Sequence, residues 1–190
     1  MKIKGDWKAG LILDWHVAHS EFLGQNQHGY PEYDTTRTAV GEALYLLKYR
    51  TDLKQMDTLA KTMADAITQT FPTVEFVVPM PPSKRRVTQP LIILAIKVAE
   101  LLNIPIFENI LLKDGKTPQM KDIKTKEEKI KALMGCFHIN DAIDNDGQWD
   151  VLIIDDLYSS GASMTAATQT MKTYGKVKNI YVAAFTRTRS

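Results

Sequence analysis

The feature that most restricts the fold is an apolar run, residues 151–154 (VLII), followed by an acidic pair and a turn of small residues. A strand that is apolar at every position must be covered on both faces, as happens in parallel sheets. After this run come the loop DDLYSSGAS, a helical segment over about residues 162–174, Gly175 as a helix stop, and the strand NIYVAAF. This order predicts a strand, helix, strand unit with a right-handed crossover.

The preceding segments show the same alternation. Residues 75–78 (EFVV) predict a short strand, residues 88–102 an apolar helix, and residues 104–107 a further strand. The sequence therefore predicts an α/β fold with a mostly parallel, twisted sheet and helices on both faces. In such sheets, ligands bind just beyond the carboxyl ends of the strands.

The first third of the chain has a different pattern. It predicts a hairpin through residues 11–22, turn residues at 24–31, a helix start at residues 34–36, and a second helix over about residues 53–70 that ends before Pro72. Val40, Leu44 and Leu47 fall at helical spacing. We expect residues 1–36 to form a small N-terminal cap or hood, and residues 37–190 to form one domain.

Composition excludes several classes of protein. The 190 residues carry 24 Lys and Arg against 22 Asp and Glu, a net charge of +2, whereas a dedicated nucleic-acid binder usually needs a strongly basic face. The single cysteine, Cys136, excludes an internal disulfide and a cysteine-based zinc site. His16 and His19, three apart, leave open a metal pair or ordinary histidines. No membrane span and no secretory signal is visible, so a cytoplasmic location is expected.

The loop after residues 151–154 has the composition of a phosphate cradle. Its backbone N–H groups, the N-terminus of the next helix and the serine hydroxyls all favour an anion. Asp155 and Asp156 can accept hydrogen bonds from the vicinal hydroxyls of a sugar. A phosphate cradle beside these carboxylates therefore points to a sugar phosphate as ligand. The turn residues are Ser159, Ser160, Gly161, Ala162 and Ser163. The alternative interpretation of this loop is an acidic turn at the end of a strand, with serines that cap the next helix.

Two further loops are rich in positive charge. Lys84, Arg85 and Arg86 follow the strand at residues 75–78, where they could clamp a second anion such as a diphosphate. Residues 113–131 hold seven lysines and predict a long exposed loop, which is either a lid over a charged substrate or a solvated excursion.

Several stretches resemble one family. VLIIDDLYSSGAS resembles the signature of type I phosphoribosyltransferases, and the chain is similar to the ComF-type proteins associated with DNA uptake competence. The other matching stretches, in the same order, are LKYR (47–50), VVPMPPSKRR (77–86) and KTPQMKDIKTKEEKIKALMGCF (116–137). The chain lacks the four-cysteine zinc ribbon with which members of the family often begin, and VTQP (87–90) stands where the family usually has an arginine-glycine-phenylalanine-asparagine-glutamine stretch.

The resemblance implies binding of 5-phosphoribosyl-1-diphosphate with Mg²⁺, which substrate oxygens rather than protein ligands would hold. Asp155 and Asp156 would bind the ribose hydroxyls as the catalytic pair, and the residues from Ser159 to Ser163 would hold the 5-phosphate. The diphosphate loop would comprise Met80, Pro81, Lys84, Arg85 and Arg86, while Lys113 and Lys116 would belong to the closing loop. Homodimers are common in this superfamily.

These implications yield a leading function and an alternative. The leading one is an enzyme that transfers the phosphoribosyl group to an unidentified base or amine and releases diphosphate. The alternative is a non-catalytic sensor or competence module that keeps the fold and binds single-stranded DNA or a protein partner. Hydrolysis of a nucleotide or sugar phosphate is disfavoured, because no set of nucleophile, base and metal ligands is readable.

Overall fold

A mostly parallel sheet of five strands organises the molecule. The computed structural model describes residues 1–50, 52–82, 89–114, 123 and 125–189. The sheet order is β1-β2-β9-β8-β5, with β1 antiparallel at one edge and the other four strands parallel. Its strands are β1 (Lys2–Ile3), β2 (Ala9–Trp15), β5 (Phe76–Pro79), β8 (Trp149–Tyr158) and β9 (Val177–Arg187).

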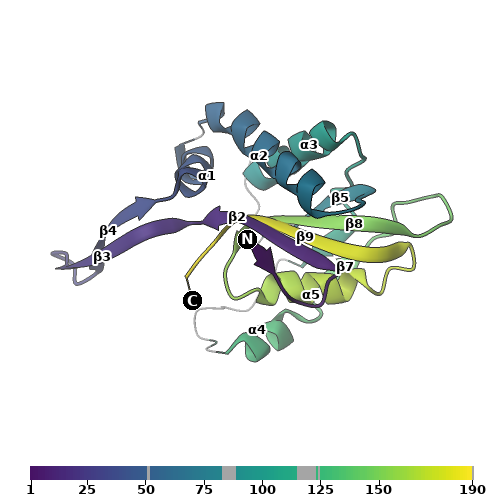
Figure 1. The fold of residues 1–190 in the computed structure, drawn as a ribbon. Helices are drawn as coiled ribbons and strands as arrows, with labels where there is room; N and C mark the ends of the chain where they lie inside the picture. The colour runs from purple at the N-terminus through teal and green to yellow at the C-terminus, as the bar shows by residue number, and fades with distance from the viewer. Residues whose placement is uncertain (51, 83–88, 115–122, 124, 190) are drawn as a thin grey trace.

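Helices cover both faces of this sheet. Figure 1 shows α1, α2 and α3 on one face and α4 and α5 on the other. The helices are α1 (Ala39–Arg50), α2 (Lys54–Thr70), α3 (Pro90–Leu102), α4 (Lys126–Leu133) and α5 (Ala162–Met171). The predicted α/β architecture is therefore confirmed.

The apolar run in β8 serves both faces, as its sequence requires. Val151 and Ile153 pack in the cluster that includes α5, while Leu152 and Ile154 pack in the cluster that includes α2 and α3. All four side chains are fully buried. Burial of one such side chain stabilises the fold by about 1.5–3 kcal/mol. The strand β8 therefore contributes to the core on both faces of the sheet.

Two short ribbons complete the structure. The ribbon of β3 (Val17–Gln25) and β4 (Pro31–Arg37) is antiparallel and extends away from the sheet beside α1 (Figure 1). The second ribbon pairs β6 (Leu111–Lys113) with β7 (Phe137–Ile139). No residue of the β3–β4 ribbon belongs to either buried cluster.

The predictions for the first third of the chain need correction. The hairpin through residues 11–22 is wrong, because β2 pairs in parallel with β9 and β3 pairs with β4. The helix start at residues 34–36 is also wrong, because these residues belong to β4 and α1 begins at Ala39 after Thr38. The hood expected of residues 1–36 therefore corresponds only to the β3–β4 ribbon, since β2 is part of the main sheet.

Later elements lie close to their predicted positions. The helices predicted near residues 53–70 and 88–102 correspond to α2 and α3. The strand predicted at residues 104–107 is reduced to one parallel bridge between Ile106 and Val77. Hydrogen bonds from Val77 N to Pro105 O and from Phe107 N to Val77 O, both 2.9 Å, hold this segment beside β5.

Candidate functional site

The site lies where β8 extends past the end of its neighbour β5. The pairing of β5 with β8 ends at Pro79 and Ile154, whereas β8 continues to pair with β9 as far as Tyr158. The sequence reading placed Asp155 and Asp156 after the strand, but both lie within it, and Asp155 pairs with Ala184. Because β5 stops first, their edge of β8 is open on one side.

A pocket of about 380 Å³ occupies this position at the carboxyl ends of β5 and β8. Its walls include both carboxylates, Lys48 from α1, Lys113 from β6, and Ser163 from the first turn of α5. The remaining lining residues are Met80, Pro81, Pro82, Gln89, Pro90, Leu91, Ile92, Phe137 and Leu157. The pocket thus combines positive and negative side chains with an apolar wall.

Asp155 is the most strongly perturbed acid in this pocket. Burial raises the pKa of its carboxyl to about 7, and the neighbouring charge of Asp156 adds to the shift. The backbone N–H of Asp156, 2.8 Å from Asp155 Oδ1, and the charges of Lys48 and Lys113 oppose it. Asp155 therefore changes its charge near neutral pH.

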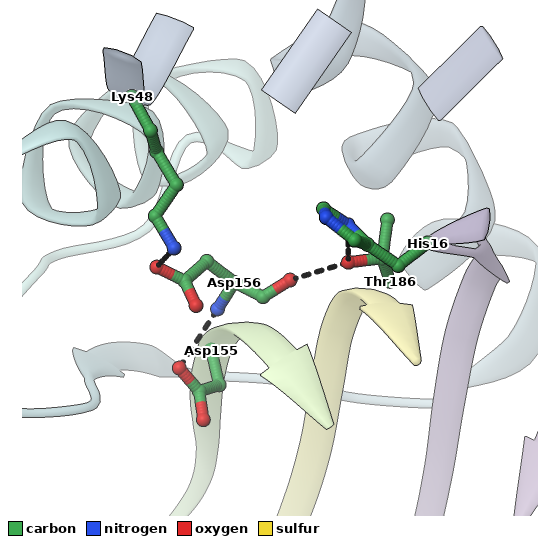
Figure 2. Close-up of polar contacts among 5 residues, drawn as sticks. All are labelled: His16, Lys48, Asp155, Asp156 and Thr186. Atoms are coloured by element: carbon green, nitrogen blue, oxygen red, sulfur yellow. Dashed lines mark hydrogen bonds and ion pairs between the residues drawn. The ribbon is translucent and has the colours of Figure 1, made fainter. Parts of the chain in front are cut away.

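Asp156 forms an ion pair with a lysine of α1. Lys48 Nζ lies 2.6 Å from Asp156 Oδ2, and both side chains are only 20% exposed (Figure 2). Lys48 occupies the position four residues after Leu44, which is buried in the core, so it lies on the inward face of α1. The sequence reading assigned no role to Lys48, although a lysine on the apolar face of a helix was a usable signal.

The expected phosphate turn lies between β8 and α5. Ser159 is exposed, Ser160 and Ser163 are partly exposed, and Ala162 is buried at the start of the helix. Ser160 Oγ accepts a hydrogen bond from Ala162 N at 3.4 Å. Of these residues, only Ser163 is in the wall of the pocket.

Gly161 has a steric reason to be glycine. Its φ of 78° lies in the left-handed region, and a Cβ there would overlap the Tyr158 hydroxyl. The turn therefore packs directly against the end of β8, which places the N-terminus of α5 beside the carboxylates.

The other predicted site residues divide into two groups. Met80, Pro81 and Lys113 lie in the pocket wall. Burial lowers the pKa of Lys113, whereas the nearby Cys136 and Asp155 raise it. Lys84, Arg85 and Arg86 lie outside the described residues, and so does the part of the predicted lid at residues 115–122 and 124, which includes Lys116.

His16 reaches the site from the other side of Asp156. Its Nδ1 lies 3.2 Å from Thr186 Oγ1, and Thr186 Oγ1 donates to the Asp156 carbonyl oxygen at 3.1 Å (Figure 2). Burial lowers the pKa of His16, and the charges of Arg37 and Lys48 lower it further. His16 follows β2 and His19 lies in β3, so they do not share a helical face. The sequence did not indicate that His16 lies beside Asp156.

The carboxylates suit Mg²⁺ only as part of a shared site. Within the described ranges, no group of three or more His, Cys, Asp and Glu residues is placed to hold a metal ion. Mg²⁺ commonly binds through one or two carboxylates together with substrate phosphates and water. Asp155 and Asp156 fit that donor set, with the substrate supplying the remaining oxygens.

Comparison with known proteins leaves the family unassigned. No protein-family model matches the chain, and no curated protein matches its sequence. Similar solved structures include an adenine phosphoribosyltransferase from Thermoanaerobacter pseudethanolicus, with 14% identity and a TM-score of 0.47 over 88% of this chain and 94% of that one.

Two larger proteins show a similar level of likeness. A Bacillus subtilis glutamine phosphoribosylpyrophosphate amidotransferase has 14% identity and a TM-score of 0.49, over 84% of this chain and 34% of that one. Leishmania donovani UMP synthase has 14% identity and a TM-score of 0.41, over 86% of this chain and 28% of that one. This chain therefore spans about a third or less of these two proteins.

No helix in the described part of the chain combines the length and the apolar composition needed to cross a membrane.

Proposed function

We propose that this chain binds 5-phosphoribosyl-1-diphosphate with Mg²⁺ and transfers its phosphoribosyl group to a nitrogen nucleophile, with release of diphosphate. The observation that carries the proposal is the pocket that joins Asp155, Asp156 and Ser163 to Met80 and Lys113. One cavity therefore combines three kinds of binding group. Its carboxylates can accept hydrogen bonds from hydroxyls, its helix N-terminus can bind a phosphate, and its cationic groups can bind a second anion.

The reaction assigns a role to each part of the pocket. Asp155 and Asp156 accept hydrogen bonds from the ribose hydroxyls, and the turn of residues 159–163 holds the 5-phosphate. The bond from C1 to diphosphate breaks with its electron pair, and the nitrogen lone pair forms the new bond to C1. The proton of the nitrogen leaves to diphosphate or water. Two carboxylates beneath the ring favour the positive charge that develops on the sugar.

Mg²⁺ would neutralise charge on the departing diphosphate. Asp155 and Asp156 are the described residues that could share in holding it. Lys48 orients the Asp156 carboxylate through their ion pair, so it is a positioning residue for the ribose site. A cytoplasmic location and a homodimer remain predictions.

Calorimetric titration with 5-phosphoribosyl-1-diphosphate and Mg²⁺ tests the binding step. Asp156→Asn should weaken binding about tenfold or more, because a charged hydrogen-bond acceptor contributes about 1.5–3 kcal/mol. Asp65→Asn is the matched control, because Asp65 pairs with Lys61 on the exposed side of α2. No binding by the wild-type protein, or unchanged binding in both Asp155→Asn and Asp156→Asn, would contradict the proposal.

One observation supports the non-catalytic alternative. The β3–β4 ribbon exposes Phe22, Leu23, Tyr30 and Tyr33, each more than half accessible, which is typical of a surface that contacts a partner. Acidic residues on the ribbon (Glu21, Glu32 and Asp34) disfavour single-stranded DNA there. Substrate binding without diphosphate release, across purine, pyrimidine and amine acceptors, would favour a sensor that binds a protein partner.

A further inference from the structure

The carboxyl ends of three adjacent strands carry an aromatic, cationic, aromatic row. Trp15 in β2 pairs with Arg187 in β9, and Arg187 pairs with Tyr158 in β8. The guanidinium carbon of Arg187 lies 4.7 Å from the centroid of the Trp15 ring and 6.0 Å from that of Tyr158. The row is in the sheet next to the proposed ribose site, since Tyr158 follows the carboxylates by two residues.

The residues beside Arg187 attach it to both parts of the proposed site. Thr186 donates to the Asp156 carbonyl oxygen at 3.1 Å. On the other side, Thr188 Oγ1 lies 3.2 Å from Ser159 Oγ. Arg187 is therefore held between the ribose carboxylates and the phosphate turn.

Positive charge in this row is not offset by the protein. Arg189 also lies over Trp15, 5.7 Å from its centroid, and neither arginine has an ion pair with a carboxylate in the described part of the chain. Arg187 Nε is buried and has no hydrogen-bond partner among the described residues. A buried donor without a partner costs about 1–3 kcal/mol, so this position favours an anion.

The nearby acids are already engaged. Glu42 pairs with Arg37 at 3.3 Å and Asp156 pairs with Lys48 at 2.6 Å. The carboxylate of Asp14 accepts the backbone N–H of Trp15 at 2.8 Å. Glu42 and Asp156 are therefore paired with other cations than Arg187 and Arg189.

His16 adjoins Arg187 through its backbone. Its backbone N–H donates to the Arg187 carbonyl oxygen at 2.8 Å. Thr186 gives its proton to a carbonyl oxygen, so His16 Nδ1 must donate to Thr186 Oγ1. Nε2 of the neutral ring then carries the lone pair. In Figure 2, His16 and Lys48 approach Asp156 from opposite sides.

The corner that presents Trp15 and His16 is held firmly. Thr38 Oγ1 donates to the Trp15 carbonyl oxygen at 2.5 Å and accepts Gly41 N at 3.0 Å, so one side chain joins this corner to the first turn of α1. A Cβ on Gly41 would overlap the His16 carbonyl oxygen. Close packing of this kind preorganises a binding site.

We propose that His16 and Arg187, supported by Trp15, form the subsite for the phosphoribosyl acceptor, and that this acceptor carries an anionic group. The inference rests on the proposed function, because it names the class of the second substrate. His16 Nε2 accepts an N–H of the acceptor, and Arg187 binds its carboxylate or phosphate. His16 adjoins the pocket through Lys48 and Asp156, which line the pocket and whose charges act on His16.

Matched nucleotides test the subsite by equilibrium binding. Orotidine 5′-monophosphate differs from uridine 5′-monophosphate by one carboxylate, and nicotinate mononucleotide differs from nicotinamide mononucleotide by carboxylate against amide. We expect the carboxylated member of at least one pair to bind about tenfold more tightly, as for a charge-assisted hydrogen bond. Arg187→Gln should reduce this ratio to near one, and Arg187→Lys should restore part of it. Lys61→Gln, which removes an exposed charge on α2, is the control.

The ratio within each variant separates the possible roles of Arg187. If Arg187 instead holds the 5-phosphate, Arg187→Gln weakens both members of a pair equally and leaves the ratio unchanged, which overturns the proposal. Failure of both carboxylated nucleotides to bind more tightly than their partners, including failure to bind, also overturns it. The titration of wild-type protein with 5-phosphoribosyl-1-diphosphate reports separately on the proposed function.

Discussion

At the scale of single residues, the acidic pair divides into two chemically different groups. Asp156 pairs with Lys48 at 2.6 Å. The pKa of Asp155 is raised to about 7, first by burial and then by the charge of Asp156. The sequence shows two equal aspartates, and the different surroundings of their carboxyl groups separate them.

Asp155→Asn should therefore stabilise the protein at neutral and alkaline pH. The folded-state pKa lies above the unfolded value of 3.8, so the folded protein loses stability as pH rises from about 4 to about 7. The variant carries no charge at this position and does not lose this stability. Its free energy of unfolding should exceed that of the wild-type protein by about 1–3 kcal/mol at about pH 8. Urea unfolding at about pH 8 and about pH 4.5 measures it. A gain that does not shrink toward the acidic pH would contradict the assignment.

Lys48→Met should shift the pH dependence of substrate binding. The charge of Lys48 lowers the pKa of Asp155, so its removal should move the midpoint for binding 5-phosphoribosyl-1-diphosphate upward by about half to one pH unit. Titrations across about pH 6 to 9 provide the profile. Lys61→Met should keep the wild-type midpoint, and an unshifted profile in Lys48→Met would contradict the effect of the Lys48 charge on Asp155.

At the scale of elements, the turn into α5 depends on one backbone conformation. Gly161 has a φ of 78° and no space for a Cβ against Tyr158. The apolar residues of α5 then pack under the sheet, so the turn and the helix form one rigid unit. Strain at Gly161 would be transmitted to the serines on both sides of it.

Gly161→Ala should lower the free energy of unfolding by about 1–3 kcal/mol, the usual cost of a strained backbone position, and should weaken substrate binding. Gly175→Ala is the matched control, because a Cβ there meets no atom within 4 Å. Denaturant unfolding and calorimetry give the two quantities. Equal stability of the two variants would show that the turn can relax.

At the scale of the whole molecule, the first third of the chain has two structural roles. β2 contributes Leu11 and Ile12 to the two buried clusters, one on each face of the sheet. The β3–β4 ribbon contributes no residue to either cluster and carries exposed aromatic side chains instead. A domain boundary at residue 36 would separate β2 from the sheet to which it belongs.

Removal of the ribbon tip should therefore be tolerated, whereas removal of β2 should not. Replacement of residues 21–34 by a short glycine-containing turn should change the thermal midpoint by only a few degrees, roughly as expected for a change of up to 1 kcal/mol. Deletion of residues 1–15 should prevent cooperative folding, because it removes buried apolar surface from both faces. Calorimetric scans of the two variants test this. Cooperative unfolding of the truncated chain would support a separate cap.

The sequence alone determined the parallel strands β8 and β9 and the helix between them, because the pattern of VLII followed by a small-residue turn and a second apolar strand has few alternative folds. It also indicated Asp155, Asp156 and the turn, since they follow one another along the chain. Only the tertiary structure decided that Lys48 pairs with Asp156 and that His16 lies beside Thr186 and Arg187. These residues are far apart in sequence and come together because β2 pairs with β9 and α1 packs against both strands. Periodicity reports the neighbours of a residue within its own element, whereas charge pairing and burial depend on elements brought together by folding.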